Sequence, residues 1–340
     1  MSAARLELRR EQILAFRRGV GALDERLLSG PESLRRAAWA GLQDSMPRAA
    51  VLSIHARVEG VGPDVWEDPA LVQVWGPRFS AYVVAAVDRA VFTLGRMPDD
   101  SPLRVRAEGT ARRIGEFLHG RRMSFAEVGH GLGVPPNSLR YAALTGTVLI
   151  RWDGARRPPI WTVPPPEMTP AEARLELARR YLHVFGPGTA AAFGEWAGLR
   201  PPAKLAAFEA LAGELAPVRT PVGDAWILAA DEAAFRAPAR PAAPARLLPS
   251  GDAYFLLQGV DRDLLVADPA CRARLWTPRV WPGAVLVEGE IVGTWRRSQT
   301  DFAIGTWRPL TPGQRQAVEA EAHSMPLPGS EQGVRVEWSD

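Results

Sequence analysis

The sequence of 340 residues has very little lysine and very little cysteine. Lys204 is the single lysine, so nearly all of the 41 basic residues are arginine. Cys271 is the single cysteine, which excludes an internal disulfide framework and a thiolate metal cluster and fits a reducing compartment. The five histidines show no His-x-x-x-His spacing. We therefore expect no metal and no cofactor.

Long apolar runs and a phosphate-binding loop are also absent from the sequence. No run reaches the roughly 18 apolar residues that a membrane-spanning helix needs. The first residues, "MSAARLELRREQ", are charged and lack the apolar core of a signal peptide. No Walker-type loop occurs. The expectation is a cytoplasmic protein without a membrane partner.

The charge of the chain leaves its partners open. The formal net charge is +3, which is too small to indicate nucleic acid by itself. Arginine binds phosphate through two parallel hydrogen bonds and stacks on bases. A GC-rich genome also enriches Arg, Ala, Gly and Pro, so composition does not separate the two explanations. The hydrophobic share of 46% is enough for two or three domain-sized cores.

The first segment of the chain is predicted to contain three helices followed by a hairpin. Apolar residues have helical spacing over 9–22 and 33–42, and a third helix is expected over about 47–58. Residues 71–85, "LVQVWGPRFSAYVVA", hold two β-rich runs around a Gly-Pro pair, which predicts a hairpin. Helix, helix, helix, hairpin is the order of a winged helix.

The second segment repeats this order with stronger signals. A helix over 103–119 precedes "SFAE" at 124–127, a capping box that begins a short helix. A further helix stops at Gly146, and two strands meet across Asp153-Gly154, a tight-turn pair.

A third segment and a β-rich C-terminal part follow. Helices are predicted over 170–185, 188–198 and 202–215, and a hairpin turns near Gly223. The last helix of the chain is expected over 312–323. The predicted fold is α+β, with winged helix 1 at 1–100, winged helix 2 at 101–166, winged helix 3 at 167–234, a stiff linker at 235–246, a small β-barrel with a terminal helix at 247–326, and a flexible tail at 327–340.

The second winged helix supplies the clearest candidate DNA contacts. A winged helix places one helix in the major groove and its hairpin on the backbone. The alternative is that the module packs against its neighbours or binds protein. The predicted contacts are Asn137, Arg140, Tyr141 and Thr145 on the groove helix and Arg156 and Arg157 at the wing tip.

The stretch "WAGLQDSMPRAA" interrupts two apolar runs with Gln43, Asp44 and Ser45. Asp44 or Ser45 is expected to cap the helix that begins near Pro47. Capping does not account for Gln43, because a turn after Leu42 needs no glutamine.

The chain resembles winged-helix DNA glycosylases of the AlkZ/YcaQ type over most of its length. The resemblance rests on "AGLQDSMPRAA", "VQVWGPRFSAYVV", "ARRYLHVFGPGTAAAFGEWAGL", "RLLPSGDAYFLL" and "VLVEGEIVGTWRR". It implies three tandem winged helices and a C-terminal β-barrel curved around a DNA-binding cleft. It also implies excision of alkylated purines or unhooking of interstrand crosslinks in DNA repair, without a metal.

The resemblance also assigns residues. The catalytic motif of the family is a glutamine, one variable residue and a second Gln or Asp. Gln43 matches the first position, Asp44 is the variable residue, and Ser45 departs from the pattern at the third. In the hairpin, Arg78 is retained and Tyr82 stands where the family often has histidine.

Three functions remain open at this point. The chain is predicted to be a monofunctional DNA glycosylase, with a catalytically silent DNA-binding protein or a protein-interaction scaffold as alternatives. We expect a monomer that binds double-stranded, damaged DNA. Further candidate contacts are Arg48 after the motif and Arg296 and Arg297 in the loop "RRSQTD", which is otherwise an exposed hairpin tip.

Overall fold

The computed structural model describes residues 5–46, 48–99, 101–154, 158–257, 259–327 and 333–339. The fold is mixed α+β, with three small three-stranded sheets and one five-stranded sheet among these residues. The length and apolarity that would let a helix cross a bilayer are not found in any helix of the described ranges.

Module 1 surrounds the first small sheet, whose strand order is β2-β4-β3. The predicted helix over 33–42 ends at residue 37, so Gln43 lies in a short strand rather than in a turn. Pro47 lies outside the described residues, and Arg48 has a left-handed φ of 63° directly before the third helix. The elements of module 1 are α2 (Pro31–Ala37), β2 (Leu42–Gln43), α3 (Ala49–His55), η1 (Val65–Glu67), β3 (Leu71–Trp75), η2 (Pro77–Phe79) and β4 (Ala81–Ala85).

Module 2 has the same element order and the same strand pattern, β5-β7-β6. The capping box at Ser124 and Glu127 is confirmed, because each side chain accepts from the other residue's backbone amide. The predicted groove helix is a 3-10 helix that stops at Gly146, which has φ 71°. The elements are η3 (Ala86–Asp88), α4 (Arg89–Thr93) and η4 (Leu94–Arg96) as the connection, then α5 (Ser101–Leu118), β5 (Met123–Ser124), α6 (Phe125–Gly131), η5 (Pro136–Thr145), β6 (Val148–Ile150) and β7 (Pro159–Thr162).

Module 3 confirms the predicted helix over 170–185, which Thr169 caps through the amide of Glu172. Its sheet takes its third strand from the N-terminus, because β1 pairs in parallel with β8. The helix predicted over 202–215 ends at residue 210. The elements are β1 (Leu6–Glu7), α1 (Arg10–Val20), α7 (Pro170–Phe185), α8 (Ala190–Ala197), α9 (Pro201–Ala210), η6 (Ala212–Glu214), β8 (Leu215–Thr220), β9 (Gly223–Leu228), η7 (Ala229–Asp231) and α10 (Glu232–Arg236).

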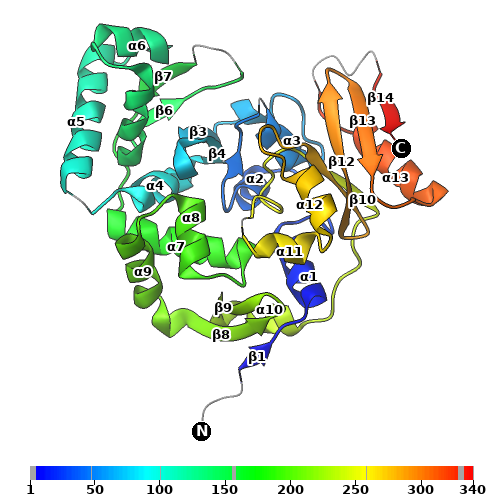
Figure 1. Ribbon diagram of the computed structural model, residues 1–340. Helices are drawn as coiled ribbons and strands as arrows, with labels where there is room; N and C mark the ends of the chain where they lie inside the picture. The colour runs from blue at the N-terminus through cyan, green and yellow to red at the C-terminus, as the bar shows by residue number, and fades with distance from the viewer. Residues whose placement is uncertain are drawn as a thin grey trace.

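The N-terminal helix α1 packs against α7 and α10 of module 3, although it is contiguous in sequence with module 1 (Figure 1). Ile13 and Phe16 share a buried cluster with Val218 and Ile227 of the third sheet. Arg10 donates to Glu290 of the C-terminal sheet at 2.6 Å. The chain thus closes on itself, with its first helix joining module 3 to the C-terminal part.

The C-terminal part is an open sheet, and the predicted β-barrel is wrong. The strand order is β10-β11-β12-β13-β14, and the two outer strands do not pair with each other. Helix α13 spans the predicted 312–323. It covers one side of the sheet, so the apolar face of the sheet is buried without barrel closure. The elements are β10 (Ala245–Leu248), α11 (Asp261–Leu265), α12 (Pro269–Leu275), β11 (Gly283–Val287), β12 (Glu290–Ser298), β13 (Asp301–Thr306), α13 (Pro312–His323) and β14 (Arg335–Ser339).

The flexible tail predicted for 327–340 is wrong for residues 335–339, which form β14 in parallel with β13. Alternate residues of β14 are half-buried, and Val336 and Trp338 pack against the sheet's core. The linker predicted over 235–246 is shorter, because α10 includes Arg236 and β10 begins at Ala245.

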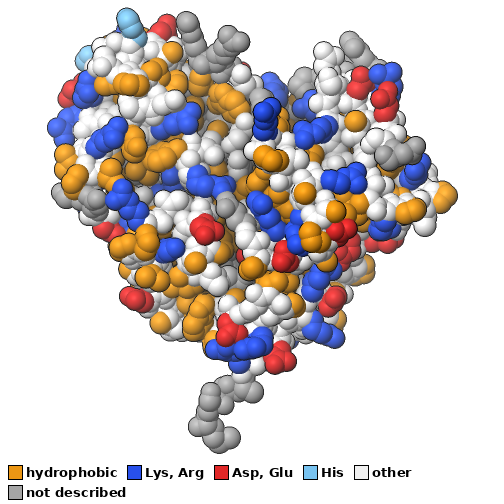
Figure 2. All heavy atoms as spheres, in the orientation of Figure 1, with side chains coloured by type: hydrophobic (Ala, Val, Ile, Leu, Met, Phe, Trp, Pro, Cys, Tyr) orange, Lys and Arg blue, Asp and Glu red, His pale blue; other side chains and the backbone are white. Residues whose placement is uncertain are grey.

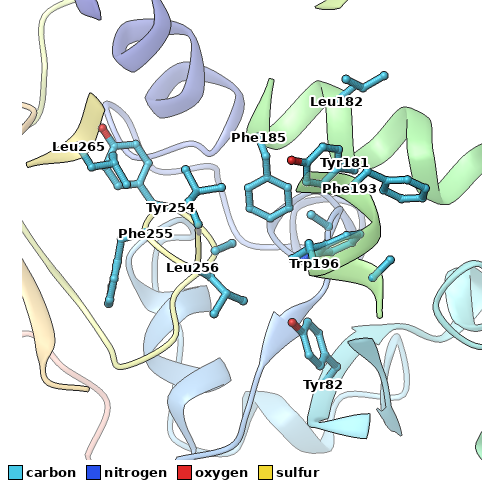
Figure 3. Close-up of a cluster of buried hydrophobic side chains, with 14 of the residues drawn as sticks. Tyr82, Tyr181, Leu182, Phe185, Phe193, Trp196, Tyr254, Phe255, Leu256 and Leu265 are labelled. Carbon is cyan, nitrogen blue, oxygen red and sulfur yellow. The ribbon is translucent and has the colours of Figure 1, made fainter. Parts of the chain in front are cut away.

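An aromatic core joins module 1, module 3 and the loop after β10 (Figure 3). Tyr181 lies 5.4 Å from Phe193 between ring centroids, and Trp196 lies 5.5 Å from Tyr181. Tyr82 of β4 and Tyr254 of the loop belong to the same buried cluster. Because three distant parts of the chain share this core, side chains at the ends of β2 and β4 are fixed relative to the loop.

Candidate functional site

Gln43 and Ser45 contact each other at the end of β2. Gln43 pairs with Tyr82 across the β2–β4 ladder, and its Nε2 donates to the Oγ of Ser45 at 2.9 Å. Ser45 is exposed, so its hydroxyl is accessible to solvent. Gln43 Oε1 is buried, and no donor in the described part of the chain reaches it. The pair therefore presents one hydroxyl that an amide orients.

Asp44 points away from this pair and into the protein. Its side chain is 1% exposed and accepts from the Ala50 amide at 3.0 Å, at the first turn of α3. Gln73 Nε2 donates to the other carboxylate oxygen at 2.7 Å. Burial raises the pKa of Asp44 to about 7, against the opposing effect of these two hydrogen bonds. Asp44 thus binds an amide of the first turn of α3, although Arg48 occupies the N-cap position, and its geometry does not support the catalytic role that the motif suggested.

Replacing Asp44 by Asn should reduce the dependence of stability on pH. Because the folded-state pKa of about 7 exceeds the reference value of 3.8, Asp44 contributes fully to stability below about pH 4 and loses this contribution as pH rises through about 7. The change corresponds to on the order of 4 kcal/mol. When the pH is raised from about 5 to about 8, the apparent Tm should fall more in the wild type than in Asp44→Asn. An equal fall in both proteins would contradict this assignment.

Gln73 connects the β6–β7 hairpin of module 2 to the Asp44 segment. Its amide nitrogen also donates to the Trp152 carbonyl at 3.1 Å, and its carbonyl oxygen accepts from the Trp152 amide. The side chain is 5% exposed, so all three hydrogen bonds are shielded from water. Sequence reasoning missed Gln73, although one glutamine within the apolar strand "LVQVW" was an available signal.

The loop after β10 packs against Gln43. A Cβ added at Gly251, which has φ +76°, would lie 3.4 Å from the Cδ of Gln43. The next residue, Asp252, is fully buried and accepts from both terminal nitrogens of Arg57 at 2.7 Å. Ser53 Oγ donates to the same carboxylate at 2.7 Å. A buried ion pair between Arg57, which follows α3, and this loop therefore holds the backbone of Gly251 against Gln43.

A pocket of about 470 Å³ opens beside Ser45. Aromatic and basic side chains from both module 1 and module 2 surround it. Arg78 follows β3 at a left-handed φ of 55°, and Arg140 lies on η5. The lining includes Ser45, Trp75, Arg78, Phe79, Phe125, Arg140 and Trp152. Three of the predicted residues, Ser45, Arg78 and Arg140, are thus brought together.

Other predicted contacts lie elsewhere. Tyr82 is fully buried, and burial raises its pKa to about 12, so a DNA contact through Tyr82 is not retained. As the direct partner of Gln43 in the ladder, it supports that side chain from within the core. Tyr141 packs on Phe79 with ring centroids 5.3 Å apart. Thr145 is half-buried and donates to the Ala142 carbonyl.

The remaining predicted contacts are distributed around the site. Asn137 is exposed at the start of η5. Arg296 is exposed on β12 and donates to the Val280 carbonyl at 2.9 Å. Burial, and then the charge of Arg48, lowers the pKa of Arg297 on β12. The C-terminal sheet therefore lies near Arg48, which follows the motif of residues 43–45. Arg156 and Arg157 lie outside the described residues.

The arginines around Ser45 differ from those in the body of the protein. Arg17, Arg57 and Arg180 form ion pairs and are almost fully buried. The six arginines of the site form no ion pair with any carboxylate in the described ranges, and Figure 2 shows arginine side chains along the hollow between the two upper lobes. These six are Arg48, Arg78, Arg140, Arg151, Arg262 and Arg297. Uncompensated charge of one sign at one place favours binding of a polyanion.

Other chemistry has little support at this site. Within the described ranges, no three His, Cys, Asp or Glu side chains are grouped so that they could hold a metal ion. Cys271 lies on α12 and is 9% exposed. Burial raises the pKa of its thiol, and Asp268, which accepts a hydrogen bond from the thiol at 3.4 Å, raises it further. It therefore packs as a thiol.

Comparison with known proteins identifies the family and the fold of the chain. The family model described as DNA glycosylase AlkZ-like matches residues 36–326. The solved structure of Streptomyces sahachiroi DNA glycosylase AlkZ superposes with a TM-score of 0.78 at 16% sequence identity, covering 98% of this chain and 100% of that chain. No curated protein matches the sequence. The chain belongs to the DNA glycosylase AlkZ-like family.

Proposed function

We propose that the protein is a monofunctional DNA glycosylase that hydrolyses the N-glycosidic bond of alkylated purines. The hydrogen bond from Gln43 to the exposed Ser45, beside a pocket lined by Arg78 and Arg140, carries the proposal. Gln43 Nε2 occupies one lone pair of the Ser45 oxygen, so the orientations open to the hydroxyl are restricted. A water molecule at this hydroxyl would be positioned to attack C1′ of the sugar.

The chemistry suits a leaving group that already carries positive charge. Water forms a bond to C1′ through an oxocarbenium-like state, and the base departs with the electron pair of the glycosidic bond. A purine alkylated at N7 leaves as a neutral molecule and needs no general acid. The proton of the water passes to solvent beside Ser45, since serine is not a base at neutral pH. A neutral, unmodified purine lacks this help and should be a poor substrate.

DNA binding by the three modules completes the proposal. Modules 1 and 2 have the order helix, strand, helix, helical turn, hairpin, with the first strand beside the last. In module 3 a bridge between Gly188 and Trp226 replaces that pairing. We infer three winged helices that present the unpaired arginines to one damaged duplex, with the chain acting as a monomer. The positive potential at the site is then stronger than the net charge of +3 of the whole chain indicates.

The wild-type protein should release 7-methylguanine from an alkylated duplex and should release no guanine from the same duplex left unmodified. The free bases are measured by chromatography with mass detection. The matched variant Ser45→Ala should bind the duplex with the affinity of the wild type and release 7-methylguanine about 100-fold more slowly, because the attacking water loses the side chain that positions it.

Two outcomes would contradict the proposal. No release by any variant, with DNA binding intact, would favour the catalytically silent DNA-binding protein, for which Ser45 in place of an acidic or amide residue is the supporting observation. Absence of DNA binding would favour the interaction scaffold.

A further inference from the structure

Trp66 contacts two arginines beside the motif. The guanidinium carbon of Arg48 lies 5.0 Å from the centroid of the indole, and that of Arg151 lies 4.5 Å from it. Arg151 Nη1 also donates to the Trp66 backbone carbonyl at 2.9 Å. The three residues come from the start of α3, from η1 and from the end of β6. A single ring thus joins module 1 to the wing of module 2.

The charge around Trp66 is not neutralised. Neither Arg48 nor Arg151 forms an ion pair with a described carboxylate, although Glu67 and Asp68 are adjacent to Trp66 in sequence. Arg297 of the C-terminal sheet lies close enough to Arg48 for the two charges to interact. Three cations therefore converge without an ion pair to a described carboxylate, and the acidic group that the charge of Arg48 acts on is the buried Asp44. Such a group is unfavourable by itself and becomes favourable when an anion binds.

The indole also restricts the two side chains. A free arginine loses much rotamer entropy when it binds, and a guanidinium held over an aromatic ring has already lost part of it. All three side chains are half-buried, so each keeps an edge in solvent. Arg48 is three residues from Ser45, which places this group next to the proposed reaction centre.

We propose that Arg48, Trp66 and Arg151 form a clamp for one phosphodiester of the DNA strand near the target nucleotide. Trp66 is a positioning residue here, and the two guanidinium groups make the phosphate contacts. Phosphate suits this arrangement, because a guanidinium donates two parallel hydrogen bonds to phosphate oxygens. The inference rests on the DNA-binding part of the proposed function and not on the glycosylase reaction.

The clamp can be tested by the salt dependence of binding to an unmodified duplex, measured by fluorescence anisotropy. Arg48→Ala should reduce the slope of log K against log salt by about 1, as expected for one lost phosphate contact. Trp66→Ala should also reduce the slope and weaken binding roughly tenfold. Trp66→Phe keeps a ring beside both arginines and should restore most of the affinity.

The control is Trp338→Ala. Arg315 lies 4.8 Å from the centroid of Trp338 on the edge strand β14, so this variant removes a similar contact away from the site. It should bind DNA as the wild type does. Equal slopes for Trp66→Ala and wild type, or an equal loss in Trp338→Ala, would overturn the clamp. A wild type that binds duplex but releases no 7-methylguanine would refute the glycosylase and leave the clamp intact.

Discussion

Gln43→Ala should slow the release of 7-methylguanine by about 100-fold, as Ser45→Ala does, because the amide acts through the Ser45 hydroxyl and a misplaced attacking water costs about this much. The variant removes the donor that fixes the Ser45 hydroxyl at 2.9 Å and leaves the pocket and its arginines unchanged. Single-turnover rates at saturating protein measure this loss without a contribution from binding.

The same variant should keep its fold and its affinity for DNA. Gln43 contributes no described ion pair, and its main-chain pairing with Tyr82 does not depend on the side chain. A release rate within a few-fold of the wild type would remove Gln43 from the mechanism. A loss of both affinity and apparent Tm would show that the side chain acts through structure.

Arg57→Ala should destabilise the protein by about 3–5 kcal/mol, because it leaves a buried carboxylate without its cation. The side chains of Arg57 and Asp252 are 4% and 0% exposed, so water cannot replace the lost partner. The loop that carries Gly251 should move away from Gln43, and 7-methylguanine release should fall together with stability. Denaturant midpoints and release rates measure the two effects.

Two variants control for this result. Arg5→Ala removes an ion pair with Asp224 whose side chains are 45% and 54% exposed, so the loss should stay below about 1 kcal/mol. The double variant Arg57→Met with Asp252→Leu replaces the pair by apolar groups and should recover much of the stability lost in Arg57→Ala. A loss in Arg57→Ala no larger than that in Arg5→Ala would contradict the structural role of the pair.

Local signals in the sequence predicted the elements that depend on local interactions. The helix over 170–185 is bounded by the Thr169 cap and by Phe185 before a Gly-Pro pair. The capping box at Ser124 and the final helix over 312–323 are likewise confirmed. In each case the residues that begin and end the element are its sequence neighbours, so spacing alone identifies them.

Interactions between distant residues were not predictable in the same way. Arg57 and Asp252 form an ion pair although they are 195 residues apart, and no periodic pattern in the sequence indicates that they meet. The third strand of module 3 comes from residues 6 and 7, which sequence order had assigned to module 1. The C-terminal strands have the pattern expected of a barrel, but pairing partners decide closure, and helix α13 covers the sheet instead.

For the candidate site, the resemblance assigned Gln43, Ser45 and Arg78 to the catalytic or DNA-binding residues. It assigned Tyr82 and Asp44 to the same group. In the structure, the side chains of Tyr82 and Asp44 are buried in the core and do not line the site. Tyr82 pairs with Gln43 in the antiparallel ladder, and Asp44 accepts from an amide at the first turn of α3. The residues that hold the site in place, Gln73 and Gly251 among them, act through contacts that appear only once the chain is folded.

A double-mutant cycle tests the central claim, that Gln43 and Ser45 act together on one water. Single-turnover release of 7-methylguanine is measured for the wild type, Gln43→Ala, Ser45→Ala and the double variant on one alkylated duplex. If the two side chains share one function, the double variant should be no slower than Gln43→Ala alone, because Ser45 is not oriented without the amide. Fully additive losses, or rates equal to the wild type in all variants, would contradict the account.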